Sequence, residues 1–176
     1  DIQTMMFEVK EKVMGYDVTV EDVMPAILQD TFYYNRSGGG VTLSGGEALL
    51  QPNFGPHLLH ACKDYGINTA IETTGFARWE FIEKYLPYLD YVLMDIKHMN
   101  SAKHKEFTTQ PNELIHENAK RIAESGMVDL TIRVPVIPTF NATPEEIYDI
   151  AMFAASLKGV KKLHLLPYHR LGQGKY

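Results

Sequence analysis

The sequence lacks the features that mark a disulfide-linked, membrane or nucleic-acid-binding protein. Its 176 residues include one cysteine, Cys62, which excludes an intramolecular disulfide and suits a reducing compartment. No apolar run approaches the roughly 20 residues of a membrane-spanning helix, and no signal peptide is evident. The formal net charge is −5 and the basic residues are scattered, so there is no electrostatic case for nucleic acid or an anionic membrane as a partner. We therefore expect a cytoplasmic protein.

What the sequence does contain is the composition of an ordinary globular domain. Hydrophobic residues make up 45% and charged residues 22% of the chain, and 176 residues are enough for one substantial core. There is no internal repeat, low-complexity tract or linker. The whole chain, residues 1–176, is therefore expected to form a single domain.

Helical and strand patterns alternate along the chain. Strands are predicted over residues 41–43, 67–73, 91–96, 130–137 and 162–166, and helices over residues 18–34, 56–65, 78–86, 111–125 and 144–158. Strands that alternate with helices imply βαβ units and a parallel sheet, so we expect an α/β fold. Five strands do not close an eight-stranded barrel. The fold is therefore either a partial (β/α) barrel or a piece of something longer.

The segment from Ser37 to Pro52 is the most informative part of the sequence. It holds a glycine cluster, a short apolar strand, the turn Ser44-Gly-Gly-Glu47 and the expected start of a helix. Because glycine lacks a Cβ atom and permits positive φ, the backbone at Gly45 and Gly46 can approach a ligand closely. Ligands of α/β folds usually bind where strands end. We therefore expect a small polar ligand at this turn.

Two nucleotide-binding interpretations of the glycines fail. The turn is similar to the signature of ATP-binding-cassette proteins, but that class also needs a phosphate loop of the Gly-x-x-x-x-Gly-Lys-Ser/Thr type. The sequence contains no such loop. A dinucleotide-binding fingerprint fails because the cluster at residues 38–40 precedes the strand instead of following it.

Polar residues gather where the predicted strands end. These residues are Glu47, Glu72, Asp95, Lys97 and His169. Arg133 lies within its strand and could point inward. The carboxyl ends of parallel strands share one edge, which is the functional face of a (β/α) barrel. Asp95 and Lys97 could form a surface ion pair. Alternatively, they lie at a buried strand end, where a charge is costly unless it is paired or serves a function.

Two other functions stay open at this point. A metal-dependent barrel hydrolase could use Asp95, His164 and His169, since carboxylate and imidazole groups bind divalent metals. However, His164 alternates with leucines in mid-strand, and there is no His-x-His pair. The other possibility is a non-catalytic scaffold that binds a partner protein without a cofactor, which a test of ligand binding would distinguish.

Four short motifs, in their order and spacing, resemble those of glycyl-radical-enzyme activating enzymes. They are Ser44-Gly-Gly-Glu47, Glu72-Thr-Thr-Gly75, Asp95-Ile-Lys97 and Leu166-Pro-Tyr-His169. The resemblance covers residues from about 18 to 176, and the pyruvate formate-lyase activating enzymes are the nearest named members. These enzymes belong to the radical S-adenosylmethionine (SAM) superfamily. The resemblance implies a partial (β/α) barrel of the radical SAM type, with its first strand before this chain begins.

The same resemblance implies a reaction and its partners. A [4Fe-4S] cluster passes one electron to SAM, methionine leaves, and the 5′-deoxyadenosyl radical abstracts hydrogen from a backbone glycine. That glycine belongs to a glycyl radical enzyme such as pyruvate formate-lyase. A flavodoxin or ferredoxin would donate the electron. The cofactors carry the chemistry, while the protein binds, orients and excludes water.

The resemblance also implies roles for individual residues. Gly45, Gly46 and Glu47 match the motif that receives the amino group of SAM, since carbonyl groups and a carboxylate accept hydrogen bonds from an ammonium. Arg133 matches a cationic position suited to the SAM carboxylate. The other matches to SAM-binding positions are Asp95, Ile96, Lys97 and His169.

A monovalent cation beside SAM is a further implication of the resemblance. Its ligands would be Glu72, Thr73 and Asp95. Glu72 stands where the family commonly has an aspartate, which changes the reach of the carboxylate.

The sequence departs from the family in its cluster ligands. The family holds the cluster through Cys-x-x-x-Cys-x-x-Cys near the N-terminus, and three thiolates are needed. This sequence has only Cys62, which lies among apolar residues, matches none of the three and is expected to be a core thiol. We therefore expect the chain to be an internal portion of a longer enzyme, without the first strand and the cluster loop, and to be inactive by itself.

Overall fold

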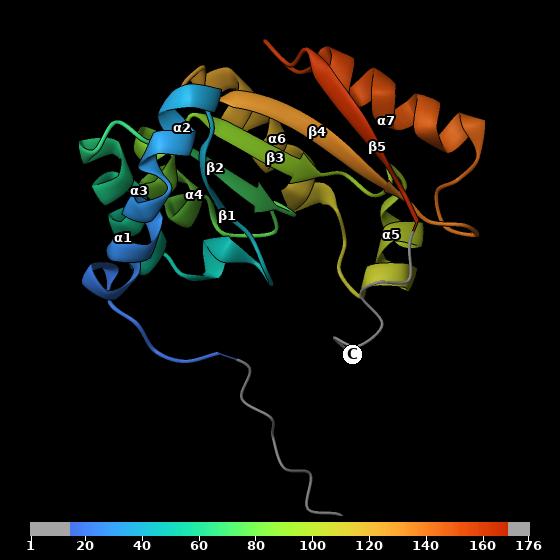
Figure 1. Cartoon of the computed structure of the whole chain (residues 1–176). Helices are drawn as coiled ribbons and strands as arrows, with labels where there is room; N and C mark the ends of the chain where they lie inside the picture. The colour runs from blue at the N-terminus through green and yellow to red at the C-terminus, as the bar shows by residue number, and fades with distance from the viewer. Residues whose placement is uncertain (1–14, 169–176) are drawn as a thin grey trace, which may run out of the picture.

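The computed structural model describes residues 15–168 (Figure 1). The strands are β1 (Gly40–Leu43), β2 (Asn68–Thr73), β3 (Tyr91–Asp95), β4 (Asp129–Val136) and β5 (Lys162–Pro167). The α-helices are α1 (Val20–Gln29), α2 (Thr31–Ser37), α3 (Phe54–Asp64), α4 (Trp79–Tyr85), α5 (Ser101–Thr108), α6 (Glu113–Ser125) and α7 (Pro144–Ser156), with short 3-10 helices η1 (Ala48–Leu50) and η2 (Leu86–Tyr88). None of the described helices is long and apolar enough to cross a lipid bilayer.

The five strands form one parallel sheet. Its order is β1-β2-β3-β4-β5, so each strand pairs with its neighbours in sequence. A helical connection crosses back after each of the first four strands, and connections of one hand place their helices on one side of the sheet. Figure 1 shows the sheet curving, with α3, α4 and α6 behind it. The α/β fold and the partial barrel predicted from the sequence are confirmed.

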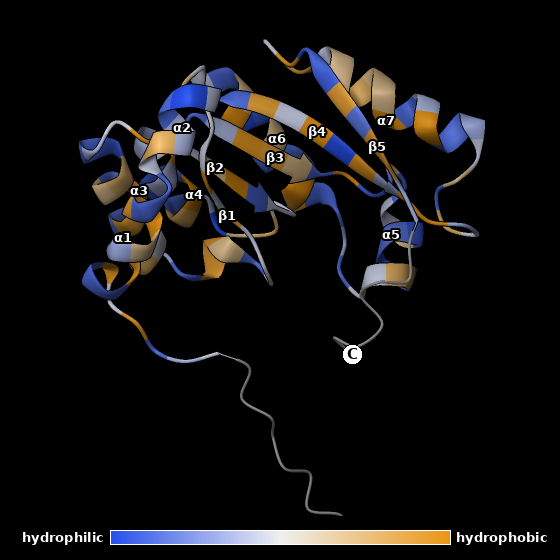
Figure 2. Cartoon of the chain, in the orientation of Figure 1, coloured by the Kyte–Doolittle hydropathy of each residue, from blue (hydrophilic) through white to orange (hydrophobic). Residues whose placement is uncertain are grey.

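The two faces of the sheet differ in polarity. Residues that pair across a parallel sheet lie on the same face, so Thr73, Met94 and Ile132 form one row. This row faces the helices, and Met94 and Ile132 have no exposed surface. Asp95 and Arg133 pair on the opposite face. Figure 2 shows hydrophobic and hydrophilic residues alternating along β4, as a strand between a core and an open face requires.

The helix predicted over residues 18–34 is in fact two helices. They are separated at Asp30, which has φ −96° and ψ 7°. The hydroxyl of Thr31 donates to the carbonyl of Leu28 at 2.7 Å, and side-chain bonds of this kind compete with the helical backbone pattern. The predicted start is correct, because Thr19 caps α1 through a capping box.

The sequence pattern predicts neither η1 nor α5. The glycine turn leads into the short helix η1, and α3 begins at Phe54, close to the predicted start at Pro56. The other element is α5, which begins where the side chain of Asn100 accepts a hydrogen bond from the N–H of Lys103. Its one buried residue is His104, so it lacks the apolar stripe by which the other helices are predicted.

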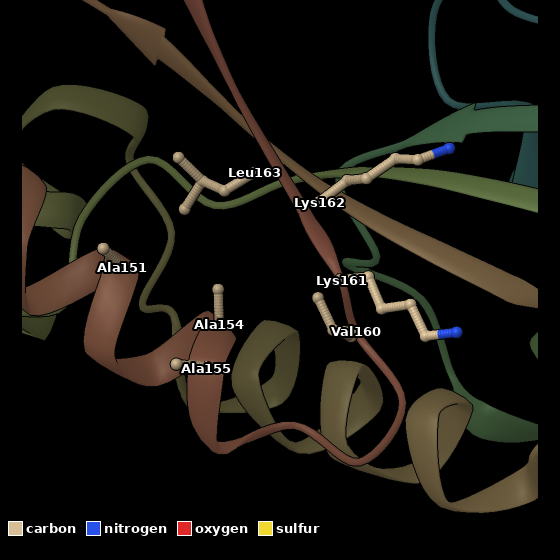
Figure 3. A pocket seen from close by; sticks show the side chains of 7 residues that line it. All are labelled: Ala151, Ala154, Ala155, Val160, Lys161, Lys162 and Leu163. Carbon is tan, nitrogen blue, oxygen red and sulfur yellow. The ribbon is translucent and has the colours of Figure 1, made fainter.

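A hollow of about 190 Å³ lies between α7 and the start of β5 (Figure 3). Ala151 and Ala154 line it from the helix and Leu163 from the strand, whereas Lys161 and Lys162 point away from the alanines. The side chains that face the hollow are aliphatic and provide no acid, base or nucleophile. Groups able to do chemistry lie instead at the carboxyl edge of the sheet.

Two histidines on α5 and α6 are expected to make the stability of the fold depend on pH near neutrality. His104 is buried and His116 is half-buried, and burial is the main cause that lowers the pKa of both imidazoles. As the pH falls, the unfolded chain therefore takes up protons before the folded chain does. The folded state is therefore not penalised by these two imidazoles above pH 6.5, the ordinary pKa of histidine. It loses free energy of unfolding as the pH falls below that value. We expect a lower urea midpoint at about pH 5.5 than at about pH 7.5.

The variant His104→Gln is expected to flatten this pH dependence. The matched control is His57→Gln, because His57 is exposed on α3 and its removal should leave the pH dependence unchanged. A urea midpoint that rises as the pH falls through this range would contradict the prediction.

Candidate functional site

The carboxyl ends of β1 to β4 meet around a small cavity of about 80 Å³. Residues from three of the four sequence motifs converge on it, together with one residue of β4. The residues that line it are Ser44, Gly45, Gly46, Glu72, Thr73, Thr74, Asp95 and Arg133. The structure therefore brings together most of the side chains that the sequence assigns to one ligand.

The turn after β1 leaves its backbone open. Gly45 has φ +119°, which side chains rarely adopt, and a Cβ atom at either Gly45 or Gly46 would meet no other atom within 4 Å. Both glycines are exposed. A ligand can therefore reach the backbone groups of this turn, as the sequence predicts.

Glu47 lies in the same turn but its carboxylate is fully engaged within the protein. One oxygen accepts from the hydroxyl of Thr73 at 2.6 Å and from the N–H of Leu49 at 3.2 Å. The other accepts from the hydroxyl of Thr74 at 2.6 Å and from its N–H at 2.9 Å. Four donors fill the acceptor capacity of a carboxylate. Glu47 thus fastens the glycine turn to the end of β2 and caps η1.

Arg133 links the ends of β2 and β3 on the open face. Its Nη1 donates to Glu72 at 2.6 Å, while its Nε and Nη2 lie 2.9 Å from one oxygen of Asp95. The second oxygen of Glu72 accepts from the hydroxyl of Ser44 at 2.8 Å. The Ser44 hydroxyl and then the Arg133 guanidinium hold the pKa of Glu72 below its ordinary value. Burial lowers the pKa of Arg133, but Asp95 and Glu72 more than offset it, so the net shift is upward.

Lys97 and Ile96 follow Asp95 at the end of β3. The Nζ of Lys97 lies 3.9 Å from Asp95, at the limit of an ion pair. Ile96 has no exposed surface, so only its backbone can face a ligand, and its N–H already donates to the carbonyl of Arg133. His169, the remaining predicted SAM contact, lies outside the described residues.

Two residues that the sequence reasoning misses support this edge from outside it. The side-chain amide of Asn141 donates to the carbonyls of Lys97 and Pro135, and its oxygen accepts from the N–H of Ile137. These partners are scattered along the chain, so no local signal marks the residue.

Tyr85 is the second supporting residue. Its hydroxyl lies 2.7 Å from the carbonyl oxygens of both Ala48 and Gln51, which follow the glycine turn. Burial, and secondarily the charge of Glu47, raises the pKa of Tyr85 to about 12. Its ring lies against Gly55, where a Cβ atom would come within 2.1 Å of the hydroxyl oxygen.

The metal-hydrolase alternative finds no support in the geometry. Among residues 15–168, no group of three or more His, Cys, Asp or Glu side chains is arranged to hold a metal ion. Asp95 is bonded to Arg133 instead, and His164 projects from β5. Cys62 is fully buried in a second apolar cluster with Met24, and burial raises the pKa of its thiol. It is the core thiol that the sequence predicts.

The fold is the core of a partial (β/α) barrel, and charged side chains line a small cavity at its carboxyl edge. The chain belongs to the radical SAM superfamily, because the family model of that superfamily matches residues 6–154. This match includes the glycine turn and all four strands that surround the cavity.

The curated relatives are glycyl-radical-enzyme activating enzymes. The isethionate sulfite-lyase activating enzyme of Nitratidesulfovibrio vulgaris is 45% identical over 163 residues, which are 92% of this chain and 52% of the relative. The choline trimethylamine-lyase activating enzyme of Oleidesulfovibrio alaskensis is 41% identical, over 93% of this chain and 54% of the relative. The pyruvate formate-lyase-activating enzyme of Clostridium pasteurianum is 39% identical, over 92% of this chain and 67% of the relative. The chain thus spans about half the length of the first two relatives.

Solved structures agree with this assignment. A domain of pyruvate-formate lyase-activating enzyme from Bacteroides vulgatus superimposes with a TM-score of 0.68 and 41% identity, covering 74% of this chain and 81% of that chain. SuiB of Streptococcus suis, solved with bound S-adenosylmethionine, has a TM-score of 0.70 at 17% identity, covering 90% of this chain and 36% of that chain. The second likeness shows the fold alone.

Proposed function

We propose that this chain is the core of an enzyme that activates a glycyl radical enzyme. The complete enzyme would cleave SAM reductively to a 5′-deoxyadenosyl radical, which abstracts hydrogen from a backbone glycine of its partner. The observation that most supports this is the 39–45% identity to activating enzymes over 92–93% of the chain. We further propose a cytoplasmic location and a flavodoxin or ferredoxin as electron donor.

The residues at the carboxyl edge suit the methionine end of SAM. The open backbone at Gly45 and Gly46 would accept hydrogen bonds from its ammonium group. Lys97 and Arg133 supply positive charge at this edge and would attract its carboxylate. The remaining contacts proposed for SAM come from Asp95, the backbone of Ile96 and His169.

Glu47 would act differently from the two glycines before it. Because its carboxylate already accepts four hydrogen bonds, it would hold the turn in shape instead of receiving the ammonium group. Its contribution to SAM binding would then be to orient the backbone of Gly45 and Gly46.

The iron–sulfur cluster of the superfamily does not fit the residues of this chain. Such a cluster needs three thiolates in this superfamily, and the chain has one cysteine, which is fully buried in the core. In the proposed enzyme, the cluster ligands lie outside these 176 residues. The chain alone should therefore bind SAM at most and should not cleave it.

Anaerobic assays test this function. The full-length protein, reconstituted with iron and sulfide and reduced, is expected to release 5′-deoxyadenosine from SAM. It should also generate a glycyl radical, detected by electron paramagnetic resonance, in one of the lyases that the relatives' names specify. The 176-residue chain should give neither product under the same conditions. A reconstituted full-length protein that carries a cluster but never cleaves SAM would refute the proposal.

SAM binding to the chain itself gives a second test. Gly45→Ala forces a side chain onto φ +119° and should weaken SAM binding at least about tenfold, which corresponds to ~1.4 kcal/mol. Gly159→Ala is the matched control, because Gly159 also has positive φ and open surroundings but lies between α7 and β5. Equal binding by the two variants would show that the turn does not contact SAM.

A further inference from the structure

On the open face of the carboxyl edge, two carboxylates lie beside two cations. The carboxylates of Glu72 and Asp95 face the cations of Arg133 and Lys97. Arg133 lies between the two acids and contacts both, and only 15% of its side chain is exposed. Lys97 stands further out, at 3.9 Å from Asp95. The guanidinium is therefore the main positive charge that both carboxylates meet.

The monovalent-cation site expected at Glu72, Thr73 and Asp95 does not fit this arrangement. Thr73 projects from the opposite face of the sheet, where its hydroxyl donates to Glu47 at 2.6 Å. Both oxygens of Glu72 already accept hydrogen bonds, and one oxygen of Asp95 accepts from the Nε–H of Arg133 and lies 2.9 Å from its Nη2. An ion placed between the acids would contact the guanidinium, and like charges repel strongly in partly buried surroundings.

We propose that the guanidinium of Arg133 is the fixed cation of this edge and takes the place of a bound sodium or potassium ion. A planar guanidinium can reach two carboxylates at once with directional hydrogen bonds, which a spherical ion cannot reproduce. It is tethered to β4, so its placement costs none of the entropy that is lost when an ion is taken from solution.

This role does not prevent Arg133 from meeting a ligand. Two of its five N–H groups donate hydrogen bonds to Glu72 and Asp95. The remaining N–H groups can still donate to an anionic group in the cavity. The proposal concerns the charge arrangement of the folded chain, and it holds whatever reaction the complete enzyme catalyses.

Thermal unfolding of the full chain in different salts tests the proposal. Melting temperatures would be compared in potassium, sodium and tetramethylammonium chloride at equal ionic strength, with thallium(I) NMR as a direct probe of ion binding. The wild-type chain is expected to melt at one temperature in all three salts and to show no saturable thallium binding.

Removing the guanidinium should create a dependence on the ion. In Arg133→Ala, the two carboxylates lose their shared counter-charge and face a common space. This variant should melt lower than wild type in tetramethylammonium, recover by several degrees in potassium or sodium in a saturable way, and bind thallium(I). Arg133→Lys keeps a fixed positive charge, so its melting temperature should be the same in all three salts.

Lys97→Ala is the matched control for net charge. It removes one positive charge beside the same Asp95 but leaves the guanidinium in place, so no preference for potassium or sodium is expected. The proposal would be overturned if the wild-type chain bound thallium(I) saturably and Glu72→Gln abolished that binding. This experiment does not depend on whether an Arg133 variant folds. A folded Arg133→Ala variant without any ion preference would overturn it as well.

Discussion

Replacing Gly40 with alanine is expected to lower the free energy of unfolding by about 3 kcal/mol. An alanine Cβ at this position would lie 1.8 Å from the carbonyl oxygen of Asn68 and 2.5 Å from its carbonyl carbon. These are backbone atoms of β2, and Asn68 is the residue that pairs with Gly40. Since no side-chain rotation can relieve the clash, β1 has to move away from the sheet. Urea unfolding would measure the loss.

The neighbouring Gly39 provides the control for this prediction. An alanine Cβ there would approach only the side-chain oxygen of Ser37, at 2.9 Å, and that hydroxyl can rotate away into solvent, where water replaces its exposed hydrogen bonds to Tyr33 and Gly39. We expect Gly39→Ala to change the free energy of unfolding by less than about 0.5 kcal/mol. Equal losses in the two variants would mean that the general cost of removing a glycine, and not the contact with β2, determines stability here.

The glycines show how far sequence reasoning reaches at this site. The sequence predicts that the backbone at Gly45 and Gly46 approaches a ligand. That interpretation fits Gly45, whose φ is +119° and whose surroundings are open. At Gly40 the close neighbour is the chain's own strand β2. Both positions require glycine, but which surface approaches each backbone depends on strand pairing, which the local sequence does not contain.

Most of the regular elements were predictable because they have a local signal. The strands are apolar runs bounded by turn residues, and their alternation with helices is enough to predict a parallel sheet. Caps such as Thr19 and Thr143 also act locally, through bonds to residues three positions further on. Where the local signal is weak, as in α5, or where a side chain competes with the backbone, as at Thr31, the prediction is wrong or missing.

The candidate site was predictable as a set of residues but not as a network. Strand-end position and motif spacing identify Glu47, Glu72, Asp95 and Arg133. What each carboxylate contacts depends on partners far along the chain: Thr74 is 27 residues from Glu47, and Arg133 is 61 residues from Glu72. Glu47 therefore looks like a ligand-binding group in the sequence, although in the structure its carboxylate is saturated by the protein.

Asn141 supports the site from outside it, and its removal is the second change expected to have a large effect. Asn141 has no exposed surface, and it bonds the carbonyls of Lys97 and Pro135 and the N–H of Ile137. Asn141→Ala leaves these three backbone groups without a partner. A buried polar group left unpaired costs about 1–3 kcal/mol, and water entering the cavity can satisfy some of them. We expect a loss of about 3 kcal/mol in the free energy of unfolding.

Asn141→Asp separates lost hydrogen bonds from lost volume. Aspartate fills the same space and keeps the acceptor for Ile137, but its carboxylate cannot donate to the two carbonyls that Asn141 holds. It should therefore destabilise the chain at neutral pH at least as much as alanine does. Asn53→Ala is the control, because Asn53 is exposed and its side chain does not cap α3. If Asn141→Asp were as stable as wild type, packing alone would explain why Asn141 is buried. The position of Lys97 at the end of β3 would then not depend on the hydrogen bonds of Asn141.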